Sequence, residues 1–360
     1  WTFGSPSVLM MFHRRSGTLD AELAAMNECM PHYYRITQGH GQGAELLMNA
    51  EAAFMQGNFS DAQILLEQTY STIASNGQHN ISLCCDFLAA RLSLFQESVT
   101  FVKNPEVKRK ELLSLHNMMW LNIFDSTYAY YYALIRMPEK IPALFKDHML
   151  STVSFLSPCR PMMEMIENQV FLSQKMYAKV IGRSETLLPV CEKMHYELVS
   201  LHVQIQTAAA YAMLGKHHDA RQLLQKALGH AMPDGFLIPF VENYNYIKDV
   251  LGSINSITPE PFTDRILSLG SVYEQHCLRL SSRNYRPEIL NMLNSREAEI
   301  AALITDRLSN REIAERLFLS EGTVKQYVNQ IYSKLMINGD TRTKRKQLAE
   351  LISSINKGLT

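Results

Sequence analysis

Three helix starts follow one another near the carboxyl end of the chain, and their spacing constrains the fold more than any other feature. Asn294 and Glu297 form a capping-box pattern, in which a cap side chain and a glutamate three residues later satisfy backbone N–H groups that the helix leaves free. Ser309 and Glu312 repeat this pattern. Ser320 is a third N-cap candidate. The spacing predicts three short helices in succession.

The third of these helices has an apolar side and a polar side. Its apolar residues recur at helical spacing and form one stripe: Val324, Val328, Ile331 and Leu335. At about 100° per residue, small and polar residues gather on the opposite side: Gly322, Lys325, Gln326, Asn329 and Ser333. Lysine can donate to guanine, and asparagine or glutamine can pair bidentately with adenine. This side is suited to base edges, and the alternative is a helical bundle or protein-binding helix pair with a solvated polar side.

Residues 293–335 resemble the helix-turn-helix DNA-binding domain of the LuxR family of bacterial transcription regulators. The family's L-T-x-R-E, L-S-N-x-E-I-A and S-x-x-T-V-K-x-x-V-x-x-I-x-x-K-L stretches run through them almost unbroken, with Asn294 for the usual threonine and Tyr327 where histidine is common. The resemblance implies base-reading roles for three residues: Lys325, Gln326 and Asn329. It implies phosphate contacts for three others: Asn310, Thr323 and Lys334.

A fourth helix is expected over residues 344–355, and in the family this helix is the usual dimer contact. The stretch between the Lys-Leu pair and the Arg342-Thr343 pair holds about two residues more than the family pattern. Residues 291–360 contain 11 Lys and Arg against 8 Asp and Glu, an excess consistent with phosphate contacts. The run Lys344-Arg345-Lys346 fits either a phosphate clamp or a solvated helix start.

Composition restricts the remainder of the chain. With 35 Lys and Arg and 35 Asp and Glu in 360 residues, the whole protein is not a general polyanion binder and is long enough for two or more domains. The 6 cysteines show no CxxC spacing, which favours a reducing compartment without disulfides. No secretory signal or membrane-length apolar run is found, so a cytoplasmic protein is expected. Because the chain begins at Trp1, we expect a fragment of a larger protein.

Upstream of these helices, the sequence predicts an array of helical repeats. The clearest unit spans residues 201–234 and has the residue types of a tetratricopeptide repeat in order: Ala208, Tyr211, Gly215, Ala220, Leu224, Ala227 and Pro233. A second unit begins near Gly43 and has the matching set: Ala50, Gly57, Asn58, Phe59, Ala62 and Leu66. Gly182 suggests a third unit, because it precedes Gly215 by nearly the period of about 34 residues. Such units stack into a superhelix with a concave surface.

Residues 15–255 resemble, as an architecture, the helical-repeat sensor arm of the large ATP-dependent LuxR regulators. The resemblance implies that a small inducer binds the concave face. No phosphate-loop motif is present, so an ATPase domain would lie outside this chain, and we expect no cofactor within it.

An aromatic cluster offers candidate effector contacts. Most of its members share one helical stripe and are expected in the core: Trp120, Phe124, Tyr128, Tyr131 and Ile135. Tyr130 and Tyr132 lie off that stripe and are the candidates for lining the groove. The histidines lack the partners of a metal site, and no nucleophile with a base is found, so neither a metal nor a catalytic residue is predicted.

Together, the patterns predict an all-α protein with a tetratricopeptide-like arm over residues 1–280. A linker is expected over 281–290, and a four-helix LuxR-type domain over 291–360. The expected function is sequence-specific transcription regulation, controlled by an effector on the arm and by assembly into a homodimer or oligomer, with double-stranded DNA and RNA polymerase as partners. The alternative is a helical-repeat scaffold whose terminal domain docks a protein.

Overall fold

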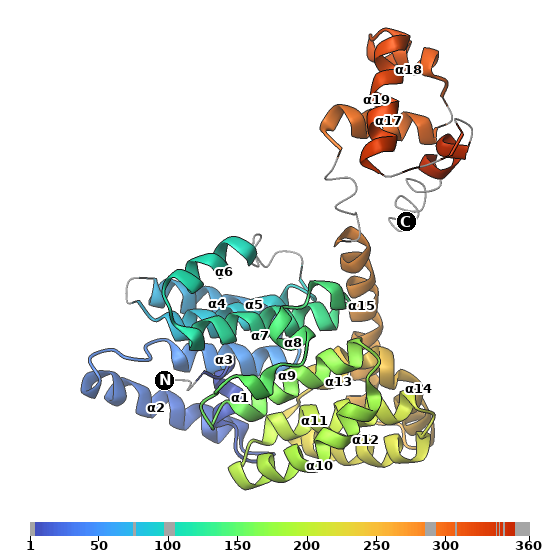
Figure 1. The fold of residues 1–360 in the computed structure, drawn as a ribbon. Helices are drawn as coiled ribbons and strands as arrows, with labels where there is room; N and C mark the ends of the chain where they lie inside the picture. Colours follow the sequence, from blue (N-terminus) through green and yellow to red (C-terminus); the bar gives the residue numbers. More distant parts are fainter. Residues whose placement is uncertain are drawn as a thin grey trace. The chain divides into compact units, whose positions relative to one another are not determined.

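The computed structural model describes residues 4–74, 77–96, 105–284, 293–306, 308–335, 337, 339–340 and 343–349. Every regular element in these ranges is a helix, which confirms the predicted all-α class (Figure 1). The chain divides into two compact units, Trp1–Cys277 and Leu278–Thr360. No helix in the described ranges is long and apolar enough to cross a membrane.

The first unit is built from helices of four to twenty-four residues. Its α-helices are α1 (Val8–Phe12), α2 (Leu19–Ile36), α3 (Ala44–Met55), α4 (Phe59–Ile73), α5 (His79–Leu92), α6 (Pro105–Ser114), α7 (Met118–Leu134), α8 (Ala143–Lys146), α9 (Arg160–Ser173), α10 (Tyr177–Met194), α11 (Glu197–Met213), α12 (His217–Ala231), α13 (Ile238–Glu242), α14 (Tyr244–Ile257) and α15 (Pro261–Asn284), of which α15 continues past Cys277 into the second unit. Short 3-10 helices are η1 (Pro138–Lys140), η2 (Leu150–Thr152) and η3 (Met232–Asp234). Because α15 continues to Asn284, the first residues of the expected linker are helical, and 285–290 lie outside the described residues.

Two helical hairpins form where the repeat pattern predicts them. In α3–α4 and in α11–α12, consecutive helices pack against each other along their length. Gly57 and Gly215 lie in the turns with φ of +79° and +75°, a left-handed conformation that glycine adopts without a steric penalty. Small side chains stand where the paired helices cross, and all are fully buried: Ala50, Ala62, Ala208 and Ala220.

The third repeat unit is offset from its predicted position. Gly182 lies inside α10 and is exposed, and nothing beyond its own stretch of α10 comes within 4 Å of the place where its Cβ would stand. The turn between α9 and α10 instead contains Lys175, which adopts the left-handed conformation at φ +61°. The interpretation of Gly182 as a repeat turn was therefore wrong, since it relied on a glycine where the structure turns at a lysine.

Helix α1 lies in the interior of the first unit. Val8, Leu9 and Met10 are 0% exposed, and α1 packs on both α3 and α11, which belong to different hairpins. The carboxylate of Glu51 on α3 accepts hydrogen bonds from the backbone N–H groups of Val8 and Leu9, at 3.3 and 2.6 Å. Burial raises the pKa of Glu51 from its ordinary 4.5 to about 7. This carboxyl therefore joins the amino-terminal segment to the helical array.

A second buried carboxylate joins three helices. Glu242 of α13 binds the guanidinium of Arg91 on α5 through both oxygens, at 2.7 and 3.0 Å. The hydroxyl of Tyr130 on α7 donates to the same carboxylate at 2.8 Å. Arg91 also lies over the rings of Phe54 and Phe87, with its central carbon 4.9 and 5.4 Å from their centres.

The aromatic residues of α7 follow the stripe prediction in part. Phe124, Tyr128 and Ile135 are buried, as expected for core residues. Trp120 and Tyr131 are only partly buried. The prediction that Tyr130 lines an open groove is wrong, because its side chain is 0% exposed and its hydroxyl donates a hydrogen bond to Glu242.

The other candidate effector contact, Tyr132, is partly buried. It packs against a small apolar cluster that includes Phe124 and Tyr128, with its ring 5.9 Å from that of Tyr128. Its surroundings are therefore those of a side chain at the edge of a core.

Candidate nucleic-acid interface

The second unit contains the three predicted helices, α17 (Ser295–Thr305), α18 (Asn310–Leu317) and α19 (Glu321–Lys334). Both capping boxes form: Asn294 and Glu297 exchange bonds of 2.9 and 2.7 Å, and Ser309 and Glu312 exchange bonds of 3.3 and 2.6 Å. The hydroxyl of Ser320 accepts from the backbone N–H of Thr323 at 3.0 Å. The three predicted helix starts are thus confirmed.

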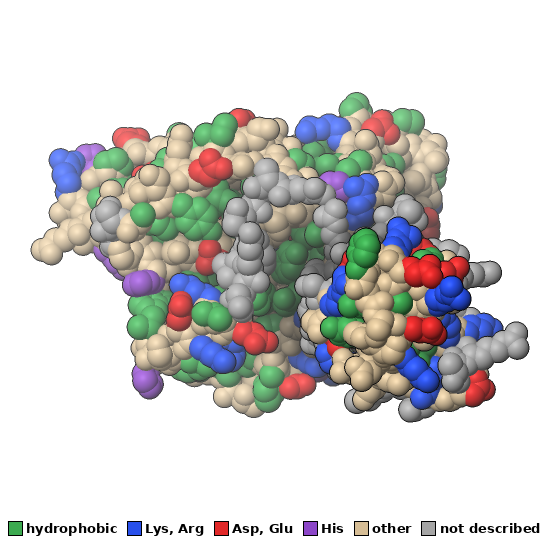
Figure 2. Space-filling model, turned by 90° about the horizontal axis from the view of Figure 1, so that it is seen from above, with side chains coloured by type: hydrophobic (Ala, Val, Ile, Leu, Met, Phe, Trp, Pro, Cys, Tyr) green, Lys and Arg blue, Asp and Glu red, His purple; other side chains and the backbone are tan. Residues whose placement is uncertain are grey.

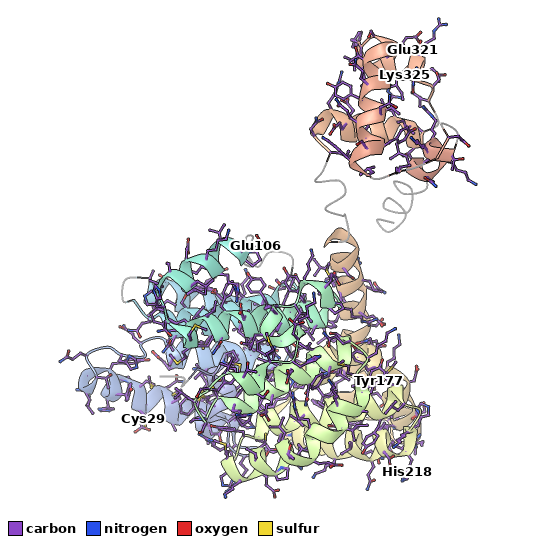
Figure 3. All side chains as sticks on the ribbon, in the orientation of Figure 1. Cys29, Glu106, Tyr177, His218, Glu321 and Lys325 are labelled. Atoms are coloured by element: carbon purple, nitrogen blue, oxygen red, sulfur yellow. The ribbon has the colours of Figure 1, made fainter. Side chains whose placement is uncertain are left out.

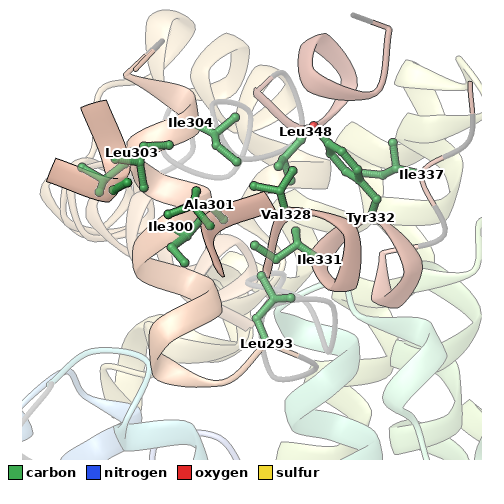
Figure 4. Packing of buried hydrophobic residues seen from close by; sticks show 13 residues of the cluster. Leu293, Ile300, Ala301, Leu303, Ile304, Val328, Ile331, Tyr332, Ile337 and Leu348 are labelled. Atoms are coloured by element: carbon green, nitrogen blue, oxygen red, sulfur yellow. The ribbon is translucent and has the colours of Figure 1, made fainter. Parts of the chain in front are cut away.

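One apolar cluster holds these helices together (Figure 4). The predicted stripe of α19 faces it, with Val324, Val328 and Ile331 buried and Leu335 partly buried at its edge. Helix α18 contributes Ile313 and the small Ala314, and α17 adds four buried residues: Ile300, Ala301, Leu303 and Ile304. The packing fixes which side of α19 is turned outward.

The polar side of α19 is open to solvent. Lys325, Gln326 and Asn329 are all exposed, as are Gly322 and Ser333. Figure 3 labels Lys325 on this helix near its amino-terminal end, together with Glu321. No ion pair engages the Lys325 ammonium among the residues that the structure describes. An ammonium and two side-chain amides therefore stand on one accessible helix surface, with the donors and acceptors needed to pair with base edges.

This surface is narrower in the last turns of α19. At about 100° per residue, Tyr332 falls close to the direction of Lys325 on the helix, yet only 5% of it is exposed. It belongs to the apolar cluster together with Ile337 and Leu348, which come from the chain after α19. The burial of Tyr332 thus narrows the accessible polar surface near the end of the helix, where Ser333 remains exposed.

Comparison with known proteins places this unit in a family. Residues 291–345 match the family described as bacterial regulatory proteins, luxR family. Residues 291–345 form a LuxR-family helix-turn-helix domain. No solved structure shows a significant match to the chain.

Three curated relatives are similar to part of the chain. Transcriptional regulatory protein LnrK of Bacillus subtilis (strain 168) is 44% identical over 57 residues, which are 16% of this chain and 26% of LnrK. Transcriptional regulatory protein DegU of Brevibacillus brevis is 45% identical over 53 residues, or 15% and 22% of the two chains. Transcriptional regulatory protein DesR of Bacillus subtilis (strain 168) is 36% identical over 75 residues, or 18% and 38%. Each similarity thus spans well under half of the relative.

The three predicted phosphate contacts of the LuxR-type domain have partners within the domain. The Thr323 hydroxyl lies 2.7 Å from that of Ser320, in the turn before α19. The side-chain oxygen of Asn310 accepts from Arg345 at 2.9 Å. The Lys334 ammonium donates to Glu297 at 2.7 Å and joins the end of α19 to the start of α17. Thr323, Asn310 and Lys334 are all partly buried.

The helical residues 343–349 account for part of the expected fourth helix, and the rest of residues 344–355 lie outside the described residues. Arg345 donates to the carbonyl of Leu308 and to Asn310, and the Lys344 ammonium lies 5.8 Å from the centre of the Tyr332 ring. Two cations of the Lys344-Arg345-Lys346 run therefore contact the domain itself. This packing role could not be predicted from the sequence, since three consecutive cations give no signal of which one turns inward.

Charges of both signs cover the domain surface. Figure 2 shows Lys and Arg side chains next to Asp and Glu side chains on the visible face of the second unit. Arg296 pairs with Glu299 at 2.7 Å and Arg311 with Glu315 at 3.2 Å. The small excess of positive charge is thus dispersed among acidic groups, so local geometry matters more than net charge here.

The buried carboxylate of Glu297 joins the start of α17 to the end of α19. Its replacement by alanine should destabilise the domain by about 1–3 kcal/mol. The carboxylate is 1% exposed and binds both the Asn294 N–H and Lys334, whose hydrogen bond lowers its pKa. Hydrogen exchange of the full chain, read by mass spectrometry, should show lost amide protection in α17 and α19.

The matched control for this prediction is Glu312→Ala. Glu312 holds the same position in the other capping box but is exposed and forms no bond to a lysine among the described residues. Its replacement should reduce protection less, and mainly at the start of α18. Equal losses for the two variants would contradict the central role of Glu297.

Proposed function

We propose that the chain is a sequence-specific DNA-binding transcription regulator that places α19 in the major groove. The observation that carries this proposal is the accessible set Lys325, Gln326 and Asn329 on a helix whose opposite side is fixed in the domain core. The match of residues 291–345 to the luxR family and the similarity of part of the chain to three transcriptional regulatory proteins support it. Lys325 would read guanine, and the two amides would read adenine.

The phosphate backbone would be held around this helix. Thr323 and Asn310 lie at the amino-terminal starts of α19 and α18, where the helix dipoles favour an anion. Lys334 would contribute to phosphate binding only by leaving or sharing Glu297, so we propose it as a secondary contact. These contacts position the protein on the duplex and do not select its sequence.

The first unit would control this binding without enzymatic activity of its own. We propose that a small-molecule effector binds the helical arm and that the protein acts in the cytoplasm as a homodimer or larger assembly, with RNA polymerase as a further partner. Two copies would place two recognition helices about one duplex turn apart. Any ATP hydrolysis would belong to a segment outside this chain, and no cofactor is proposed within it.

The test uses a duplex site selected by the full chain from a random library. Lys325→Ala and Asn329→Ala should each reduce the preference for the selected duplex over a scrambled one by about 1–3 kcal/mol, or about 5- to 150-fold, since each removes a base contact. Fluorescence anisotropy with both duplexes measures the preference directly.

Gln330→Ala is the matched control, because Gln330 is exposed on α19 but lies about 140° around the helix from Lys325. It should leave the preference unchanged. Affinity should also fall steeply between low and moderate salt, because phosphate contacts release counterions. A chain that selects no duplex, or variants that weaken both duplexes equally, would favour a protein-docking scaffold and overturn the proposal.

A further inference from the structure

Arg345 connects the helical residues 343–349 of the LuxR-type domain to the start of α18. Its Nη1 donates to the side-chain oxygen of Asn310 at 2.9 Å, and its Nη2 donates to the backbone carbonyl of Leu308. Arg345 is partly buried, and so are both of its partners. Both terminal nitrogens of the guanidinium are thus bonded within the domain, to residues 35 and 37 positions away in the chain.

The bond from Arg345 determines how the Asn310 amide is oriented. A guanidinium has donors only, so the amide oxygen must face Arg345 and the amide nitrogen must point away from it. This nitrogen bonds to no other residue among those that the structure describes, and it remains accessible to solvent. Asn310 therefore presents two unbonded N–H donors at the start of α18, while its acceptor is already occupied.

A phosphate oxygen is the kind of group that this orientation fits. The ionised oxygens of a DNA phosphate accept hydrogen bonds and donate none, so they bind the nitrogen of a side-chain amide and not its oxygen. Asn310 is the first residue of α18, where the helix dipole favours an anion. The opposite orientation of its amide would turn an acceptor toward the phosphate and lose the contact.

We propose that Arg345 is a positioning residue for DNA binding, which holds the Asn310 amide with its nitrogen toward a backbone phosphate. This role rests on the proposed function, in which Asn310 contacts the phosphate backbone, and adds a residue from outside α17, α18 and α19. Arg345 then acts through Asn310, and neither as a phosphate clamp nor as part of a solvated helix start, the two interpretations of the Lys344-Arg345-Lys346 run.

The test is a double-variant cycle on the full chain, read by fluorescence anisotropy with the selected and the scrambled duplex. Asn310→Ala should weaken binding to both duplexes by about tenfold, because it removes a hydrogen bond to a charged group that carries no sequence information. Arg345→Met should weaken both by a similar factor. The double variant should bind within about twofold of Asn310→Ala, since Arg345 acts only through Asn310.

Lys344→Met is the matched control for the loss of one positive charge. Lys344 precedes Arg345 in the chain and is also partly buried, but its ammonium lies 5.8 Å from the centre of the Tyr332 ring, and no bond joins it to Asn310 in the described part of the domain. Its effect and that of Asn310→Ala should therefore multiply. If the effects of Arg345→Met and Asn310→Ala multiplied in the same way, the positioning role would be wrong.

The salt dependence of binding separates positioning from a direct phosphate contact. A cation that neutralises a phosphate releases counterions, so its loss reduces the slope of log affinity against log salt by about 0.9, whereas a neutral amide adds little to this slope. Arg345→Met should therefore leave the slope close to that of the unaltered chain. A reduction of about 0.9 would show that Arg345 itself binds a phosphate, and would overturn the proposal.

Asn310→Asp tests the orientation while keeping an acceptor for Arg345. Its carboxylate can still accept from the guanidinium, so hydrogen exchange, read by mass spectrometry, should show no loss of amide protection in α18. A carboxylate has no donor and repels a phosphate, so binding to both duplexes should fall by at least about tenfold. Unchanged DNA binding by Asn310→Asp would show that no phosphate meets this side chain.

The positioning role and the proposed function fail in different ways. Hydrogen exchange of α18 is measured on the same variants as DNA binding. If Arg345→Met and Asn310→Ala are coupled in amide protection but multiply in DNA affinity, Arg345 only supports the fold, and the regulator function stands without the positioning role. If the unaltered chain selects no duplex, the proposed function fails and the positioning role fails with it.

Discussion

Replacing Glu242 by alanine should lower the free energy of unfolding of the first unit by about 3–5 kcal/mol, because it leaves the buried guanidinium of Arg91 without its counter-charge. Arg91 and Glu242 are each 2% exposed, and Tyr130 would lose its acceptor in the same step. Both tryptophans, Trp1 and Trp120, belong to this unit, so urea unfolding followed by tryptophan fluorescence reports on it.

The surface pair Arg160–Glu164 provides the control for this result. Its atoms are 2.9 Å apart, as close as those of the buried pair, but the Arg160 side chain is 52% exposed. Arg160→Ala should therefore change the free energy of unfolding by less than about 1 kcal/mol. The double variant Arg91→Met with Glu242→Leu should be more stable than Glu242→Ala, since it buries no unpaired charge. A small effect of Glu242→Ala would show that water or another anionic group, such as Glu51, compensates the charge of Arg91.

Replacing Glu51 by glutamine should change how stability depends on pH. A carboxyl whose pKa is raised to about 7 in the folded state, from 4.5, binds its proton more tightly there than in the unfolded chain. The contribution of this tighter proton binding to the free energy of unfolding is thus complete below pH 4.5 and is lost as pH rises to about 7. The change amounts to about 3 kcal/mol, at 1.36 kcal/mol per pKa unit. Glutamine does not titrate, so the stability of Glu51→Gln relative to the unaltered protein should rise by that amount over this window.

A constant offset between the two proteins is also expected, because the glutamine nitrogen cannot accept from Val8 or Leu9. The informative quantity is therefore the slope of the difference with pH, measured by the same fluorescence assay. Glu67→Gln is the control, since Glu67 is exposed on α4 and should give a profile parallel to that of the unaltered protein. Parallel profiles for Glu51→Gln as well would show that folding does not raise the pKa of Glu51.

Local sequence determined the elements of the LuxR-type domain and its outward face. Each capping box needs only residues three apart, and the stripe of Val324, Val328 and Ile331 needs only the helical period, so both can be read from neighbouring positions. The same holds for the α3–α4 and α11–α12 hairpins, whose turn glycines and small residues act within one repeat.

Contacts between distant residues were decided by tertiary structure alone. Arg91 and Glu242 are 151 residues apart and Lys334 and Glu297 are 37 apart, and no local period relates the members of either pair. Tyr332 is buried although its direction on α19 is that of Lys325, because residues after the helix cover it. In the turn before α19, Phe318 adopts a left-handed conformation and is 96% exposed despite its two leucine neighbours. The helical period and the capping residues determine where a helix begins and which of its sides is apolar. Which distant segment then packs against that side is determined by the tertiary fold as a whole.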